Sequence, residues 1–178
     1  MGTVRQPQPA KYFVALLSSS ADLLTIVERE LAAIFGEVDG RSEIMPWTAS
    51  KFYEKEMGAG LLRRFLSFLP PASPENLAGA KLRTQQIEEQ YRERGSGGRR
   101  LNLDPGYLDV YKVVLASTKN ACQRIYLHSG IYGEATLLYF DGGFHGLEYT
   151  YRDYLWPETL AFLTTLREVY VAQLRQLG

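Results

Sequence analysis

Cysteine is nearly absent from this chain of 178 residues, which contains only Cys122. A single cysteine excludes an internal disulfide and a metal site built from several thiolates. Because Cys122 lies in an apolar, strand-like run, we expect a small buried side chain. Residues 1–10 lack the apolar segment of a signal peptide, and the apolar run 12–17 is far too short to cross a bilayer. We therefore expect a cytoplasmic protein without a membrane partner.

A net charge is also absent, since Lys plus Arg and Asp plus Glu number 20 each. No overall attraction to nucleic acid or to an anionic membrane follows from such a balance. Local patches of one sign remain open. The balance argues against a nucleic-acid-binding protein without excluding one.

Most sequence motifs of known chemistry are missing. The chain has no P-loop, no G-x-G-x-x-G after a strand, no G-x-S-x-G and no H-x-x-x-H pair. The two histidines, His128 and His145, flank turns, where we expect exposed polar side chains. The sequence therefore names no cofactor and no dedicated set of metal ligands.

What the chain does contain is enough apolar sequence for one sizeable core, at 46% hydrophobic residues. Residues 1–10 are typical of a flexible tail, which leaves 11–178 as a single domain. "KYFVALL" favours a strand, and the serines after it can cap a helix that ends at Gly36. Strand and amphipathic helix in this order indicate an α/β or α+β unit.

Two more strands and a second helix are expected next. "SEIMPW" (42–47) favours an edge strand because Pro46 cannot donate to a ladder, and "LLRRFLSFLP" (61–70) favours a further strand. Ser73 and Pro74 predict the start of a charge-rich helix that runs to about Arg94. The order β-α-β-β-α matches most of a split βαβ plait, so we expect a ferredoxin-like start.

The segment 101–116 is ambiguous. Residues 101–103 favour a brief strand, and Asp104-Pro105-Gly106 favours a turn or a helix cap. We prefer a helix over 107–116, although its valines also suit a strand. The preceding Gly95-Ser96-Gly97-Gly98 favours a short hinge loop rather than a domain linker.

The C-terminal third favours a three-stranded antiparallel meander and a closing helix. "CQRIYLH", "EATLLYF" and "FHGLEYTY" alternate, and Asp141-Gly142 is a type I′ hairpin signal. Pro157 opens the last helix. The sequence thus predicts a single α+β domain with a mixed or antiparallel sheet.

Polar residues gather in four places. The expected loop "KFYEKEMGAG" carries Glu54 and Glu56, a carboxylate pair that could ligate Mg²⁺ or act as acid and base. On the second helix, spacing places Lys81 on one face with Thr84, Gln85 and Glu88. Each of these patterns is also common on solvated surfaces.

The other two clusters surround the ambiguous segment. Near the glycine-rich stretch lie Arg99, Arg100, Asn102 and Asp104, whose guanidinium forks and backbone N–H groups suit a phosphate. At the start of the meander, alternating positions carry Arg124, Tyr126, Tyr132 and Glu134.

Through these segments the chain resembles DUF4416, a bacterial family of unknown function. The resemblance covers nearly the whole sequence. It rests on "KYFVALLSS", "FYEKEMGAGLLRRFLSF", "KLRTQQIE", "RRLNLDPGYL", "VVLASTKN" and "RIYLHSGIYGEATL". It implies a stand-alone domain of this size with no assigned reaction or catalytic residues.

Our leading hypothesis is a domain that binds a small anionic ligand, one with a phosphate group or a nucleotide, and whether it is an enzyme stays open. The proposed acid/base or metal-ligand groups are Glu54, Glu56, Asp104 and Glu134. The proposed binding groups are Lys81, Arg99, Arg100, Asn102, Tyr107, Lys119, Arg124, Tyr126 and Tyr132. These side chains should converge on one cleft.

Two alternatives belong to other classes. Tyrosines beside arginines on a sheet face suit stacking and phosphate contacts in a non-catalytic RNA-binding module. Such a module could instead bind a protein partner. In a structural or assembly role, the closing helix would pair with another chain.

Overall fold

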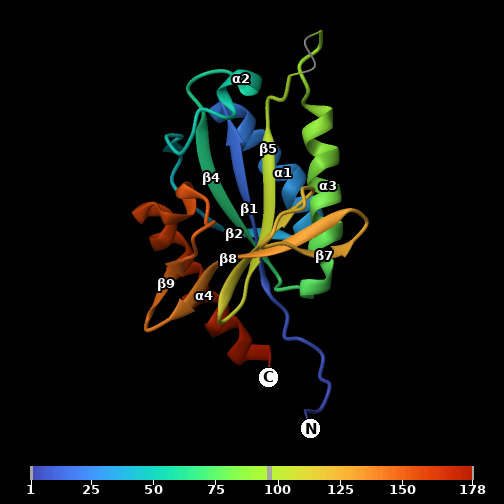
Figure 1. The fold of residues 1–178 in the computed structure, drawn as a ribbon, viewed down its shortest axis with the longest axis vertical. Coiled ribbons are helices and arrows are strands. Elements are labelled where there is room, and N and C mark those ends of the chain that lie inside the picture. Colours follow the sequence, from blue (N-terminus) through green and yellow to red (C-terminus); the bar gives the residue numbers. More distant parts are fainter. Residues whose placement is uncertain (1, 96–97, 178) are drawn as a thin grey trace.

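The computed structural model describes residues 2–95 and 98–177, which form one α+β domain around a single nine-stranded antiparallel sheet (Figure 1). Along its main path the strands follow the order β2-β4-β1-β5-β6-β8-β7, with β3 added to β4 and β9 to β8. The strands are β1 Lys11–Ser18, β2 Glu37–Arg41, β3 Met45–Pro46, β4 Leu62–Leu69, β5 Asn102–Leu108, β6 Lys112–Ser117, β7 Ile125–His128, β8 Ile131–Phe140 and β9 Gly143–Gly146. The α-helices are α1 Ala21–Phe35, α2 Glu54–Met57, α3 Leu77–Gln90 and α4 Pro157–Leu177.

Strand β1 lies at the centre of the first half of the sheet and is buried along its whole length. Its side chains alternate between two cores, as the period of a strand requires. Phe13 and Ala15 pack in the cluster that α4 covers, whereas Val14 and Leu16 pack in the cluster that α1 covers. Helices therefore cover both faces of the sheet, and β1 needs apolar residues at consecutive positions.

The first half of the chain confirms an α+β arrangement. Helix α1 connects β1 to β2, and α3 connects β4 to β5, and one strand of the sheet separates the members of each pair. Ser20 caps α1 by accepting a hydrogen bond from the Leu23 N–H, and the helix ends before Gly36 as expected. That this start is ferredoxin-like stays a prediction.

Four features of this half differ from the sequence expectations. The strand expected over 42–47 is confined to Met45–Pro46, and β2 over Glu37–Arg41 was not expected at all. The segment "EVDGR" has no apolar alternation, so its strand conformation comes from pairing with β4. The second helix ends at Gln90 instead of 94, and the expected loop "KFYEKEMGAG" contains the four-residue helix α2.

The helix expected over 107–116 is wrong, because β5 and β6 form an antiparallel hairpin there. Asp109 makes the turn by accepting hydrogen bonds from the N–H groups of Tyr111 (2.8 Å) and Lys112 (2.9 Å). This local carboxylate-to-backbone pairing competes with helix formation. The expected turn at Asp104-Pro105-Gly106 is likewise wrong, since all three residues lie within β5.

The C-terminal strands and the closing helix agree with the prediction. Asp141 and Gly142 have φ of 48° and 81°, and they join β8 to β9 with a two-residue turn that requires positive φ at both positions. Strand β8 pairs with β6 along one edge, so β7 and β9 share its other edge. Helix α4 begins at Pro157.

Cys122 is exposed, which corrects the expectation of a buried side chain. The strand-like run "CQRIYLH" starts with a turn, and β7 begins only at Ile125. His128 and His145 are exposed as predicted. Ser96 and Gly97, the middle of the expected hinge loop, lie outside the described residues.

The most consequential feature of the sheet is the point where β5 leaves β6. Pairing between β5 and β1 extends over Asn102–Leu108, but pairing between β5 and β6 covers only Gly106–Leu108. The Leu103 N–H points away from β1, because it donates to Glu88 of α3. Alternate residues of a strand share an edge, so Pro105 also faces β6. Proline has no N–H to donate, and the ladder ends there.

Gly106 holds the last paired position because the two strands approach closely there. A Cβ at this position would lie 2.7 Å from the Val114 carbonyl oxygen and 2.8 Å from the Phe13 ring. The β5–β6 pairing beside the separation thus depends on a glycine.

We predict that Gly106→Ala lowers the free energy of unfolding by about 1–3 kcal/mol, because backbone and a buried ring must move. Gly79→Ala in α3 is the matched control, since a Cβ there meets nothing within 4 Å and a helix favours alanine. Urea denaturation of both variants measures the difference. An unchanged Gly106→Ala would contradict the close approach.

Candidate functional site

A cavity of about 670 Å³ opens where β5 and β6 separate. One wall comes from β5 and α3, and the opposite wall comes from the end of β6 and the segment after it. Residues from 47–53 and from 149–154, Arg63 of β4 and Glu134 of β8 also line it. The charged residues in the lining are Arg63, Lys81, Glu88, Arg99, Asp104, Lys119, Arg124, Glu134, Arg152 and Asp153.

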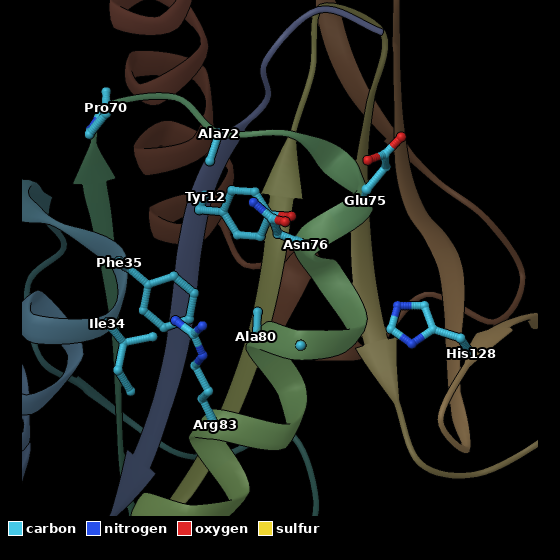
Figure 2. A pocket seen from close by; sticks show the side chains of 11 residues that line it. Tyr12, Ile34, Phe35, Pro70, Ala72, Glu75, Asn76, Ala80, Arg83 and His128 are labelled. Atoms are coloured by element: carbon cyan, nitrogen blue, oxygen red, sulfur yellow. The ribbon is translucent and has the colours of Figure 1, made fainter. Parts of the chain in front are cut away.

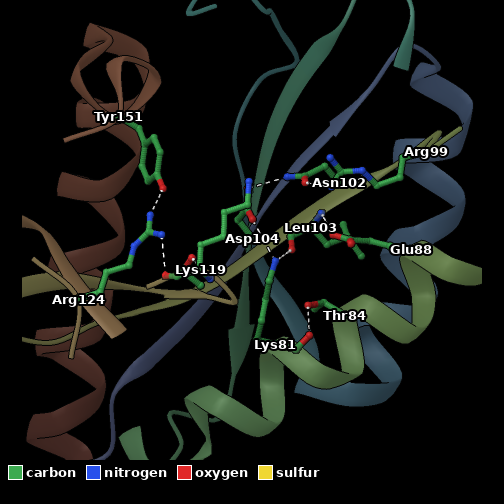
Figure 3. A network of polar contacts seen from close by, with 11 residues as sticks. Lys81, Thr84, Glu88, Arg99, Asn102, Leu103, Asp104, Lys119, Arg124 and Tyr151 are labelled. Carbon is green, nitrogen blue, oxygen red and sulfur yellow. Dashed lines mark hydrogen bonds and ion pairs between the residues drawn. The ribbon is translucent and has the colours of Figure 1, made fainter. Parts of the chain in front are cut away.

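Side chains of α3 replace β6 as partners of the β5 backbone (Figure 3). Glu88 accepts a hydrogen bond from the Leu103 N–H at 2.5 Å, and the Lys81 ammonium donates to the Leu103 carbonyl at 2.7 Å. Both side chains are buried, at 9% and 7% exposure, and Thr84 of the same face is fully buried. The polar face of α3 predicted from spacing is therefore not a solvated surface. It satisfies backbone groups that the separated strands leave unpaired.

A chain of polar contacts continues from Leu103 along the cavity wall. Lys81 also donates to Asp104 at 3.1 Å, and the Asn102 amide donates to the other Asp104 oxygen at 2.7 Å. Arg99 donates to Asn102 at 3.0 Å and forms a two-pronged ion pair with Glu56, with distances of 2.6 and 2.7 Å. Glu56 thereby ties α2 to the β5 wall.

The two carboxyl groups of this wall have opposite pKa shifts. Burial alone would raise the pKa of Asp104, but Lys81 and Arg63 outweigh it and hold the pKa below its ordinary value of 3.8. The pKa of Glu88 is raised, since burial exceeds the attraction of Lys81. Asp104 is thus a stable anion, and Glu88 protonates more readily than an exposed glutamate.

Arg63 lies at the cavity and was not predicted from the sequence. Its side chain is 3% exposed, and its Nε and Nη1 have no hydrogen-bond partner among residues 2–95 and 98–177. The Trp47 ring covers the face of the guanidinium at 4.7 Å, but N–H bonds lie in the guanidinium plane, so this contact provides no acceptor for Nε and Nη1. A signal was present at β4, where the period of a strand places Arg63 on the same face as the buried Phe65 and as Leu61, the residue before the strand.

The counter-ion of Arg63 is Asp153, with Nη2 and Oδ2 2.9 Å apart. Burial raises the pKa of Asp153 despite the nearby guanidinium. The neighbouring Tyr154 hydroxyl is buried and has no hydrogen-bond partner within the described ranges. This group of Arg63, Asp153 and Tyr154 therefore combines unmatched donors and acceptors at one side of the cavity.

The opposite wall is organised by Arg124. It donates to the Lys119 carbonyl at 2.8 Å and to the Tyr151 hydroxyl at 2.6 Å (Figure 3). It also donates to Glu134 of β8 at 2.9 Å. Burial, followed by the Glu134 charge, raises the pKa of Tyr151 to about 12, so its hydroxyl is protonated at neutral pH. These contacts hold the segment after β6 against β8.

The structure thus brings seven of the predicted site residues to one cavity and leaves the rest elsewhere. Those that line it are Lys81, Arg99, Asn102, Asp104, Lys119, Arg124 and Glu134, with Glu56 joined through Arg99. Outside the lining lie Glu54, Arg100, Tyr107, Tyr126 and Tyr132.

The excluded residues have other surroundings. Glu54 is exposed on α2, and Arg100 contributes a carbonyl to Ser18. Tyr107 packs against Tyr12 on the opposite face of the sheet, and Tyr126 and Tyr132 pack against each other with ring centroids 5.4 Å apart. Within the described ranges no three His, Cys, Asp or Glu residues come together as a metal site.

A second cavity of about 320 Å³ lies between the end of α1 and the start of α3 (Figure 2). Its lining includes Tyr12, Phe35, Arg83 and His128. The Tyr12 hydroxyl already donates to the Ser73 carbonyl at 2.9 Å, and Arg83 and His128 are exposed. Of these two cavities the larger is the better candidate site, because among the described residues Arg63 in its lining has two buried nitrogens without a partner; the similarly unmatched Arg64 Nε belongs to neither lining.

We predict that Asp104→Asn lowers the free energy of unfolding at pH 7 by about 1–3 kcal/mol, because Lys81 and Arg63 lose a partly buried counter-ion. The wild-type advantage is complete above the unfolded pKa near 3.8. It disappears as pH falls through the lower folded pKa, where wild-type Asp104 is also neutral.

Urea denaturation at pH 7, 5 and 3 measures this trend, with Asp141→Asn at an exposed turn as the control. A deficit of Asp104→Asn that is the same at pH 3 and pH 7 would contradict a lowered pKa.

Comparisons with known proteins give one match. Neither the curated proteins nor the solved structures contain one that matches the chain. No helix within 2–95 and 98–177 has the length and apolar character needed to span a membrane. A family described as a domain of unknown function, DUF4416, matches residues 8–170, so the chain belongs to this family.

Proposed function

We propose that the cavity between β5 and β6 binds a small ligand with an anionic, phosphate-type group. The observation that carries the proposal is Arg63, a buried cation in the lining with two donor nitrogens that find no partner among the described residues. Leaving the donors of a buried charge unmatched is costly, and an oxyanion provides the acceptors that they need.

The charges around Arg63 support an anion. In the described part of the chain, six Lys or Arg residues line the cavity against four Asp or Glu residues. Lys119 forms no ion pair with a carboxylate of the described residues, although its charge contributes to the lowered pKa of Glu56, and its ammonium lies 5.6 Å from the Phe52 ring centroid. Low-dielectric walls strengthen the attraction of such cations for an anionic ligand.

The carboxylates make the site selective instead of uniformly basic. Asp104 forms an ion pair with Lys81, and Glu134 forms one with Arg124. Each carboxylate therefore holds its cationic partner in place. A ligand that carries hydroxyl groups beside its phosphate finds acceptors on these carboxylates. This pattern fits a phosphorylated small molecule better than a bare inorganic anion.

We predict that at least one phosphate ester raises the melting temperature, whereas its uncharged counterpart does not. A thermal-shift panel of orthophosphate, ribose 5-phosphate, glucose 6-phosphate and nucleoside monophosphates provides the measurement, followed by calorimetric titration. Failure of every phosphate compound to bind would overturn the proposal.

Arg63→Lys should weaken binding about tenfold or more, because it keeps the charge but loses the forked donors. Arg64→Lys is the matched control, since Arg64 is the next residue and lies 3.7 Å from Glu28 instead. Lys119→Gln, at an exposed position, provides a second variant that leaves the core intact. Equal affinity of wild type and Arg63→Lys would show that the ligand binds elsewhere.

A further inference from the structure

The cavity is much larger than a phosphate group needs, and its walls differ in chemistry. At about 670 Å³ it has the size of sites for whole metabolites and cofactors. Besides the charged groups, its lining includes the aromatic residues Trp47, Phe52, Tyr53, Tyr149, Tyr151 and Tyr154. The part of the ligand that is not anionic therefore meets mostly rings.

Three of these rings form a continuous wall. Tyr53 packs edge-on against Phe52 and Trp47, with ring centroids 5.2 and 5.8 Å apart. Burial raises the pKa of Tyr53 to about 12, so the wall carries no phenolate at neutral pH. The wall ends next to Arg63, since Trp47 covers its guanidinium.

Phe52 presents its ring at the open end of this wall. Phe52 is 64% exposed. A single exposed phenylalanine is ordinary on a protein surface, but this one also lines the cavity. The Lys119 ammonium lies 5.6 Å from its centroid and comes from the opposite side, after β6. A flat ring placed here gains both stacking and a cation–π contact.

The end of the β5–β6 ladder adds a hydrogen-bonding edge. The register Gly106↔Leu115 places Ala116 opposite Pro105, so the Ala116 carbonyl receives no ladder hydrogen bond from that residue. Ala116 and the hydroxyl-bearing Thr118 both line the cavity. Ring amino and ring N–H groups are the donors that such acceptors bind.

We infer that the ligand is a nucleotide, with its base stacked on Phe52 beside Lys119 and its phosphate directed to Arg63. The inference rests on the proposed anion binding and adds the aromatic half of the ligand. Stacking of a base on an aromatic side chain is largely independent of base identity, whereas acceptors such as Ala116 favour bases with amino groups.

The test is calorimetric titration of the wild-type protein with the four common ribonucleoside 5′-monophosphates and with ribose 5-phosphate. We expect at least one nucleotide to bind about tenfold or more tightly than ribose 5-phosphate. We also expect Phe52→Ala to weaken nucleotide binding about tenfold and to leave ribose 5-phosphate binding unchanged. Tyr111→Ala, at a 70% exposed ring in the β5–β6 turn, is the control for loss of an exposed aromatic side chain.

The outcomes separate the two claims. Equal affinity for ribose 5-phosphate and every nucleotide would overturn the nucleotide inference and leave the anion site standing, as would a Phe52→Ala effect of the same size on both ligand types. If none of these five compounds and none of the other phosphate compounds in the thermal-shift panel binds, the anion site itself is overturned.

Discussion

The separation of β5 from β6 at Pro105 is the constraint on which the candidate site depends. A central strand with an unpaired edge is unstable unless its N–H and C=O groups find other partners. In this protein α3 provides them, because Glu88 accepts from the Leu103 N–H and Lys81 donates to the Leu103 carbonyl. A helix that packs on one face of the sheet thus replaces a neighbouring strand, and the space left between the strands becomes a cavity.

This replacement also explains the charges at the cavity wall. A lysine and a glutamate that bond to a buried backbone need further partners of their own, and Asp104 serves Lys81 in that role. Asn102 and Arg99 extend the network to Glu56 of α2. The network is satisfied internally, which gives the wall a fixed shape before any ligand binds.

Arg63 is different because only some of its hydrogen-bond donors have a partner. Asp153 balances its charge, and Trp47 covers its face, yet the part of the chain that the structure describes offers no acceptor to Nε and Nη1. A protein retains such a group at a cost in stability, and buried donors that lack a partner within the chain are a reason to expect a ligand. Together with Lys119 and the aromatic wall, Arg63 gives the cavity a charged end and a stacking end.

The sequence predicted much of the scaffold and part of the site. Apolar periodicity and the capping and turn residues were sufficient to predict β1, α1, the Asp141-Gly142 hairpin and the start of α4. At these elements the local sequence signals and the tertiary packing agree. The local signals failed at 101–116, because the turn at Asp109 is held by side-chain hydrogen bonds and β5 contains a proline and a glycine that normally interrupt strands.

Spacing on α3 correctly grouped Lys81 with Thr84 and Glu88 but could not show that this face is buried. The sequence also gave no reason to connect Arg63 in β4 with Asp153, ninety residues later, because their ion pair depends on the register of the sheet and the path of the chain before α4. For the same reason Tyr107 was grouped with Asp104 although strand alternation places them on opposite faces.

The central claim is that the unmatched donors of Arg63 receive the anionic group of a ligand. The most direct measurement is the ¹H–¹⁵N signal of the Arg63 Nε–H during titration with a nucleoside monophosphate. The account predicts a shift of this signal that saturates together with binding, while the Arg64 signal stays in place. Saturating binding that leaves the Arg63 signal unmoved would contradict it.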